Sequence, residues 1–289
     1  MKLAAAEIRR AVRAALTEDL GSGDVTTLAT VPPGAQSVAL MHAREPLVVA
    51  GLQLAAMAFQ EVTAHYGRRS ALNITAFARD GQRVREGAPL LKVSGPSRAL
   101  LSAERVALNF VQRLSGVASA TARFVDAIQG SGAKILDTRK TTPGWRRLEK
   151  YAVACGGGQN HRFGLNDLVL IKDNHLVALR NEKPNAISAA VTRARKKFPK
   201  LKVEVEADTL EQVAQAAEAG ADIILLDNLA PAQLRRAVKI VRGRAQTEAS
   251  GGVTLKTVRA IAATGVDFIS VGAITHSARA VDIGLDFAS

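Results

Sequence analysis

VEVEA at 203–207, DIILLDN at 222–228, AQTEAS at 245–250 and DFISVG at 267–272 are four short segments that recur at regular intervals. Each is rich in apolar or β-branched residues, which is typical of strands in a parallel sheet. The stretches between them carry apolar residues at steps of three and four, which predicts helices. Over these residues the chain therefore alternates strand and helix.

A glycine follows each of these predicted helices, at Gly220, Gly243 and Gly265. Glycine suits this position because helices commonly end in a left-handed backbone conformation. The glycines are 23 and 22 residues apart, and a βα unit of that length cannot bury its strand alone. The units must stack around one parallel sheet, most simply as a barrel, which we expect at residues 114–275.

Residues 1–113 show a different pattern, which predicts a separate α+β domain. A first helix carries Ile8, Val12 and Leu16 on one face, and a second is expected at about 52–66. Strands broken by glycine and proline are expected up to residue 93. A long helical run over about 98–128, with a break near Gly116, would connect the two domains.

The charge of the chain limits its partners. Among 289 residues, 39 Lys and Arg face 26 Asp and Glu, which leaves a formal charge of +13. Nucleic acids and acidic small molecules are the usual partners of such a chain. Because the chain has two Tyr, one Trp and no base-stacking motif, acidic small molecules are the better hypothesis. A nucleic-acid-binding protein remains the alternative, which a salt-dependent gel shift would test.

Several other classes lose support. The single cysteine, Cys155, argues against a disulfide framework and favours a reducing compartment, so we expect a cytoplasmic protein. No apolar run approaches the length of a membrane span. No GxxxxGK[ST] or GxSxG motif is present, and no GxGxxG follows a predicted strand, which disfavours a P-loop kinase, an α/β-hydrolase and a dinucleotide oxidoreductase.

Candidate functional residues gather where the predicted strands end, because the loops after parallel strands are free to carry function. Small residues follow the last two strands, and their free backbone N–H groups could cradle a phosphate. Cations follow the early strands and carboxylates the middle ones. These residues are Thr138, Arg139, Lys140, Lys172, Glu206, Asp227, Ser250, Gly251, Gly252, Gly272 and Ala273.

The two carboxylates, Glu206 and Asp227, are one repeat apart and are expected at neighbouring strand ends. They could bind Mg²⁺ partly through substrate oxygens, stabilise a developing cation, or form ion pairs with cations on the same rim. Glu204 lies two residues before Glu206 on the same side of the strand and could supplement or replace it. Its burial would decide between them.

Residues 134–172 carry eight Lys and Arg against three Asp and Glu, which favours an anion site. Within them, residues 141–164 contain a turn, one short helical piece and three consecutive glycines, and we expect a long mobile loop that could act as a lid. His161 is either an anion donor or a structural hydrogen-bonding residue. His175 and His276 show no metal-ligand spacing.

The blocks DTRKTTPG and GGGQNHRFGL, with EDLGSGDVTT, SAERVALNFVQRLSG, VEVE, LLDN, EASGG and SVGAITHS, closely resemble the quinolinate phosphoribosyltransferase family almost end to end. The resemblance implies an α/β protein with an N-terminal α/β sandwich and a C-terminal open α/β barrel. It places the sandwich at 1–113, the barrel at 114–275 and, at 276–289, a tail that returns to the N-terminal domain. It also implies a homodimer with active sites at the subunit interface.

The resemblance assigns roles residue by residue. Quinolinate carboxylates would be bound by Arg139, His161, Arg162 and Lys172, with Arg105 from the neighbouring subunit. Lys140 would lie near phosphoribosyl pyrophosphate, Glu206 and Asp227 near the ribose and Mg²⁺, and Ser250, Gly251, Gly272 and Ala273 around the 5-phosphate.

The implied reaction transfers phosphoribose to quinolinate with loss of CO₂, which gives nicotinate mononucleotide for de novo NAD biosynthesis. A molybdate-transport-associated pyrophosphorylase and a non-carboxylating nicotinate phosphoribosyltransferase are the alternatives. The full set of Arg and Lys for a dicarboxylate favours quinolinate.

Overall fold

The computed structural model describes residues 1–67 and 72–288. The chain forms two compact units, neither of which is one continuous stretch of sequence. Unit 1 comprises Met1–Ala122, Arg147–Gly157 and Ala278–Ser289, and unit 2 comprises Arg123–Arg146 and Gly158–Ser277.

Unit 2 contains a parallel sheet of six strands in the order β6-β11-β10-β9-β8-β7. The strands are β6 (Lys134–Leu136), β7 (Val169–Ile171), β8 (Val203–Ala207), β9 (Ile223–Asp227), β10 (Gln246–Ser250) and β11 (Phe268–Ser270). The helices are α6 (Asp173–Val177), α7 (Ala186–Lys197), α8 (Leu210–Glu218), α9 (Pro231–Val241), α10 (Val258–Ala262) and α11 (Ala273–His276).

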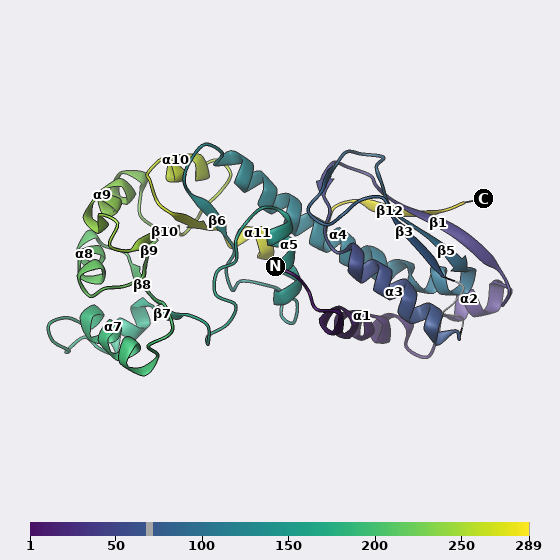
Figure 1. Cartoon of the computed structure of the whole chain (residues 1–289), viewed down its shortest axis with the longest axis horizontal. Coiled ribbons are helices and arrows are strands. Elements are labelled where there is room, and N and C mark those ends of the chain that lie inside the picture. The colour runs from purple at the N-terminus through teal and green to yellow at the C-terminus, as the bar shows by residue number, and fades with distance from the viewer. Residues whose placement is uncertain (68–71, 289) are drawn as a thin grey trace. The chain divides into compact units, whose positions relative to one another are not determined.

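Helices α7, α8, α9 and α10 lie outside the curved sheet (Figure 1). The first and last strands of the order, β6 and β7, do not pair with each other, so the barrel is open. The four predicted strands of residues 203–272 are β8 to β11, and the predicted βα architecture is confirmed.

The local sequence explains the βα repeat. In β8, Val203, Val205 and Ala207 are buried and alternate with two glutamates, so the strand presents apolar residues to one side and carboxylates to the other. Gly220, Gly243 and Gly265 follow α8, α9 and α10 with φ angles of +77°, +72° and +89°, which confirms the predicted helix ends.

Unit 1 contains an antiparallel sheet of four strands in the order β12-β1-β5-β3 and a short pair, β2-β4. The strands are β1 (Gln36–Ala43), β2 (Leu47–Val48), β3 (Asn73–Ala76), β4 (Arg83–Val84), β5 (Pro89–Pro96) and β12 (Ile283–Phe287). The helices are α1 (Ala5–Leu20), α2 (Val25–Thr30), α3 (Leu52–His65), α4 (Ser97–Ala127) and α5 (Arg146–Cys155).

The apolar face of α1 is Ile8, Val12 and Leu16, all buried, and α1 packs against α3. The last strand, β12, pairs with β1 along its whole length, so the end of the chain completes the sheet of unit 1 (Figure 1).

Helix α4 differs from the sequence-based expectation, because it runs through Gly116 without a break. A Cβ at Gly116 would overlap the backbone oxygen of Arg279. The glycine therefore allows the segment before β12 to pack closely against the helix, and it does not interrupt the helix.

Residues 141–164, which the sequence suggested as a mobile loop, contain the packed helix α5, and Leu148–Val153 are all buried. The buried Glu149 carboxylate pairs with Arg113 at 2.7 Å, and the Tyr151 hydroxyl donates to Asp80 at 2.7 Å. These contacts explain why Arg147–Gly157 belongs to unit 1, although the predicted boundaries at 113 and 275 placed it in the barrel.

Among the described residues, no helix has the length and apolar character that crossing a membrane requires.

Candidate functional site

The end of β6 organises the segment that carries His161 and Arg162. Asp137, directly after β6, is fully buried and accepts hydrogen bonds from the His161 backbone N–H and the Asn160 side chain, both at 2.8 Å. Gln159 bridges to Leu136 in a parallel sense. The buried carboxylate therefore fixes the turn that leads into Arg162.

Arg139 and Arg162 form a pair of cations at this end of the barrel. The Arg139 Nε is buried and donates to no acceptor among the described residues, and one Arg162 nitrogen donates to the Leu168 carbonyl at 3.2 Å. Burial and the neighbouring Arg139 charge lower the pKa of Arg162. Two guanidinium groups with an unused buried donor create a site that an anion would stabilise.

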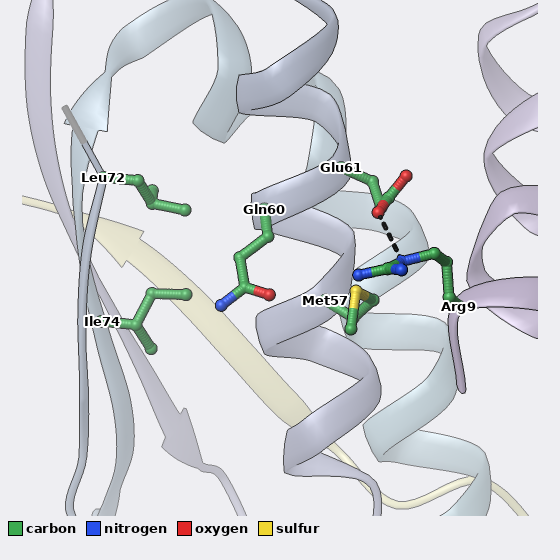
Figure 2. A pocket seen from close by; sticks show the side chains of 6 residues that line it. All are labelled: Arg9, Met57, Gln60, Glu61, Leu72 and Ile74. Carbon is green, nitrogen blue, oxygen red and sulfur yellow. Dashed lines mark ion pairs between the residues drawn. The ribbon is translucent and has the colours of Figure 1, made fainter. Parts of the chain in front are cut away.

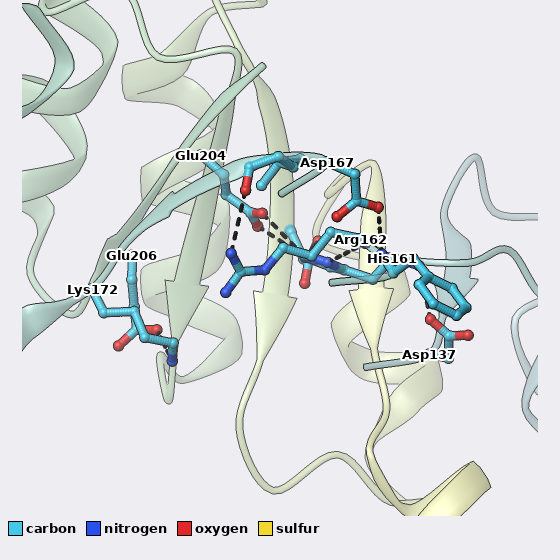
Figure 3. A network of polar contacts seen from close by, with 10 residues as sticks. Asp137, His161, Arg162, Asp167, Lys172, Glu204 and Glu206 are labelled. Carbon is cyan, nitrogen blue, oxygen red and sulfur yellow. Dashed lines mark hydrogen bonds and ion pairs between the residues drawn. The ribbon is translucent and has the colours of Figure 1, made fainter. Parts of the chain in front are cut away.

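Lys172 follows β7, and its Nζ lies 2.8 Å from a carboxylate oxygen of Glu206 at the end of β8 (Figure 3). The Glu206 side chain is 15% exposed, whereas Glu204 is fully buried. Glu206 is therefore the more accessible of the two carboxylates, which favours it over Glu204, and its role stays a prediction.

Asp227 at the end of β9 is held by the next residue, since Asn228 Nδ2 donates to Asp227 Oδ2 at 2.7 Å. Asn228 has a φ of 55°, and its backbone N–H donates to the Ser250 carbonyl at 2.9 Å. Gly251 has a φ of +95°, and a Cβ there would overlap the Asn228 side chain. Only glycine fits this turn, which is exposed.

Lys140 lies beside the turn that follows β11. The Thr275 hydroxyl contacts the backbone oxygens of Lys140 and Gly272 at 2.8 and 3.0 Å. A Cβ at Gly272 would lie 3.1 Å from Lys140 Cδ and 3.2 Å from His276 Nε2. This turn therefore brings an exposed lysine and a histidine to the start of α11, at Ala273.

Most of the predicted site residues lie in unit 2, at the carboxyl ends of its neighbouring strands. Thr138 lies among them, and its hydroxyl accepts the backbone N–H of Lys140 at 3.0 Å. Arg105 lies elsewhere, exposed on α4 in unit 1.

His161 turns toward the interior of the barrel. Its Nε2 lies 3.1 Å from Glu204 Oε2 and 3.5 Å from Glu248 Oε2, and its Nδ1 accepts the backbone N–H of Arg162 at 2.7 Å. Figure 3 shows His161 and Arg162 beside Glu204. Both ring nitrogens are engaged within the protein, so the contact of His161 with a substrate carboxylate stays a prediction.

Sequence reasoning missed two residues of this region. Glu248 lies in the middle of β10, and its position two residues before Ser250, on the same side of the strand, was the available signal. His276 lies one helical turn after Gly272, with its backbone N–H on the Gly272 carbonyl at 3.2 Å, so the spacing of four residues was the available signal.

Two cavities lie away from these residues. One, of about 450 Å³, is lined in unit 1 by Arg9, Met57, Gln60, Glu61, Leu72 and Ile74, and Arg9 pairs with Glu61 across it at 3.1 Å (Figure 2). The other, of about 660 Å³, includes Asp222, Gln246 and Asp267 in its lining, at the opposite ends of the strands of unit 2. Neither contains a predicted site residue.

Comparison with known proteins gives matches over nearly the whole chain. Residues 24–115 match the N-terminal domain and residues 117–286 the C-terminal domain of quinolinate phosphoribosyl transferase. A nicotinate-nucleotide pyrophosphorylase [carboxylating] of Mycobacterium leprae is 46% identical over 282 residues, which is 96% of each chain. A quinolinate phosphoribosyltransferase [decarboxylating] of Nicotiana glauca is 41% identical, over 96% of this chain and 82% of its own.

The fold agrees with these matches. The solved structure of the nicotinate-nucleotide pyrophosphorylase from Francisella tularensis is 39% identical and superposes with a TM-score of 0.91, over 99% of this chain and 98% of its own. Both domains, in the expected order, and the three-dimensional fold agree. The chain belongs to the quinolinate phosphoribosyl transferase family.

Proposed function

We propose that this protein transfers phosphoribose from phosphoribosyl pyrophosphate to quinolinate and removes one carboxylate, in de novo NAD biosynthesis. The products are nicotinate mononucleotide, pyrophosphate and CO₂. The names of its relatives support this reaction. So do the Arg139 and Arg162 pair, called here the anion site, and the glycine turn that follows a strand at the same end of the barrel.

The single observation that carries the proposal is the pair Arg139 and Arg162. A buried guanidinium nitrogen without an acceptor is costly unless a ligand supplies one. Two adjacent guanidinium groups suit the two neighbouring carboxylates of quinolinate, since guanidinium binds carboxylate in a bidentate manner. Lys172 lies at the same end of the barrel, where Glu206 opposes its charge at 2.8 Å, and it would contribute to the dicarboxylate site alongside the two arginines.

The phosphoribosyl pyrophosphate would lie on the other side of the same opening. Ser250 and Gly251 after β10, with Gly272 and Ala273 after β11, would hold the 5-phosphate through backbone N–H groups. Lys140, beside Gly272, would contact the pyrophosphate as a point charge.

Glu206 and Asp227 would bind Mg²⁺ together with substrate oxygens. Glu206 is paired in register with Leu225, two residues before Asp227, so both carboxylates lie at the ends of adjacent strands. Among the described residues, no third His, Cys, Asp or Glu forms a three-residue metal-binding group with these two carboxylates. Two carboxylates that leave the other positions to substrate and water suit Mg²⁺. The ion would offset the charge that gathers on pyrophosphate.

The chemistry follows from these positions. The pyridine nitrogen attacks the anomeric carbon, pyrophosphate leaves, and positive charge develops on the ribose, where the carboxylates of Glu206 and Asp227 stabilise it. The positive charge on the alkylated ring nitrogen then stabilises the electron pair that stays on the adjacent ring carbon when its carboxylate departs as CO₂, and a proton from solvent takes the place of that carboxylate.

Incubation of the purified protein with quinolinate, phosphoribosyl pyrophosphate and Mg²⁺ tests the proposal. We expect CO₂ and nicotinate mononucleotide in equal amounts. Parallel reactions with nicotinate in place of quinolinate, and without Mg²⁺, serve as controls. Turnover of nicotinate in preference to quinolinate, or none with either, would reject this function.

We also propose that the protein is a homodimer in which Arg105 completes the neighbouring subunit's dicarboxylate pocket. Its exposure on α4 supports this role, as does the family resemblance. Arg105→Ala and Lys140→Ala should each be nearly inactive alone, and mixed subunits should regain part of the activity, because one site in a mixed dimer carries neither substitution. A mixture no more active than its components would reject shared sites.

A further inference from the structure

Two glutamates inside the barrel have no part in the proposed chemistry, and both contact His161, which is predicted to reach a substrate carboxylate. Glu204 on β8 and Glu248 on β10 are 0% and 1% exposed, and His161 reaches both. Glu204 pairs in register with Ile223, and Glu248 with Leu225, so both glutamates share a face with alternate residues of the intervening strand β9. His161, Glu204 and Glu248 form a compact group, called here the buried triad.

The hydrogen bonds of His161 fix where its proton lies. Nδ1 accepts the backbone N–H of Arg162 and therefore carries no proton. In the neutral ring the proton is on Nε2, which faces Glu204 and Glu248. A metal ion at Nε2 would require the proton on Nδ1, directly against the Arg162 N–H. The contacts therefore favour a hydrogen-bonded group over a metal site.

Glu248 is the neutral member of the buried triad. Its polar neighbours are Ser270 and His161, but neither of its oxygens has a partner at normal hydrogen-bond geometry among the described residues, so an ionised carboxylate in that position would be unfavourable. Burial, with the charge of Glu204 in second place, raises the pKa of Glu248 to about 8. At neutral pH, Glu248 therefore holds a proton.

The buried triad is connected to the anion site through Arg162. The His161 ring fixes the Arg162 backbone, and the Glu204 charge attracts its guanidinium group, which opposes the repulsion by Arg139. Without that attraction, Asp167 would be the remaining carboxylate whose charge opposes the repulsion between the two guanidinium groups until substrate arrives.

We propose that Glu204 and Glu248 are positioning residues that, through His161, hold Arg162 beside Arg139 in the geometry that binds the dicarboxylate. The proposal rests on the proposed function, because it concerns the same anion site. In this proposal the two buried glutamates determine how well the dicarboxylate binds, and other residues carry out the phosphoribosyl transfer.

Steady-state kinetics of buried variants test this assignment. Glu204→Gln should raise KM for quinolinate by about 10- to 100-fold, the scale for losing a hydrogen bond to a charged group, and should leave KM for phosphoribosyl pyrophosphate unchanged. Glu248→Leu should raise KM for quinolinate by about tenfold. Glu248→Gln should restore it, because glutamine resembles the protonated carboxyl group.

Thr247→Val is the matched control. Thr247 is buried next to Glu248 on β10, and its hydroxyl bonds to Asp267 at 2.8 Å, away from the buried triad. The control should lower the melting temperature without changing either KM. Equal changes in both KM values for the Glu204 and Glu248 variants would mean a merely structural role and would overturn the proposal.

The position of the His161 proton can be measured on the unchanged protein, so this test does not depend on whether a variant folds. Nitrogen NMR of labelled histidines should show His161 as the neutral tautomer with its proton on Nε2. A proton on Nδ1, or a tightly bound metal ion that Glu204→Gln loses, would overturn the buried triad. If the unchanged protein failed to use quinolinate, the proposed function would be wrong. If the unchanged protein used quinolinate and Glu204→Gln kept the same KM for quinolinate, only the positioning role would be wrong.

Discussion

Replacement of Glu248 by glutamine should make the stability of the protein less sensitive to pH. The pKa of this carboxyl group is raised from 4.5 to about 8 in the folded protein. Below pH 4.5 the proton is bound in both the folded and the unfolded state, and the protonated Glu248 contributes its full stability. As the pH rises toward 8, the unfolded state releases the proton while the folded state keeps it, so the free energy of unfolding falls.

The magnitude follows from that interval. Each pH unit between the two pKa values is worth about 1.4 kcal/mol, so the loss across the window reaches at most about 5 kcal/mol. Glutamine cannot titrate. The free energy of unfolding of Glu248→Gln, relative to that of the unchanged protein, should therefore rise steadily from pH 5 to 8. Above pH 8 the difference should level off.

Urea unfolding followed by circular dichroism at a series of pH values measures this difference directly. The exposed Glu218 on α8 offers a matched control, because Glu218→Gln makes the same substitution at a solvated side chain outside the buried triad. Parallel curves for Glu248→Gln and the unchanged protein would show that Glu248 is ionised in the folded state, and the reasoning about the buried triad would then be wrong.

Three further substitutions test other parts of the structure. Lys140→Ala should lower turnover by roughly 10²- to 10³-fold, the scale for removing one preorganised charge, and a near-normal rate of CO₂ release would contradict its role. Gly251→Ala, whose Cβ would overlap the Asn228 side chain, should raise KM for phosphoribosyl pyrophosphate at least about tenfold in initial-rate assays and leave KM for quinolinate near normal. Gly116→Ala should destabilise the protein by about 1–3 kcal/mol in urea unfolding, because its Cβ meets a backbone oxygen. Gly132→Ala, with open space around it, is the control and should change little.

The periodic part of the chain was predictable because its signals are local. Strand and helix alternate in the hydrophobic pattern, and the glycines after α8, α9 and α10 mark helix ends through their own backbone preference. Parallel pairing then requires that Glu206 and Asp227 lie at one edge of the sheet, so their proximity could be expected before any coordinates.

Other features depend on partners far away in sequence. Arg113 and Asp80 bind side chains of helix α5, and no pattern within residues 141–164 indicates these two partners. Gly116 resembled a helix break, but its role is set by the approach of Arg279. Glu248 lies in a strand whose pattern cannot show that a histidine from another segment will reach it.

The pairing of β12 with β1 imposes an order of events during synthesis. The partner of β1 is made after all six strands of the barrel, so the nascent first sheet stays open along that edge while the ribosome translates the rest. Helix α5, another part of unit 1, also emerges late. A gene cut at residue 113 would therefore produce a fragment with an unprotected strand edge, which invites association between chains.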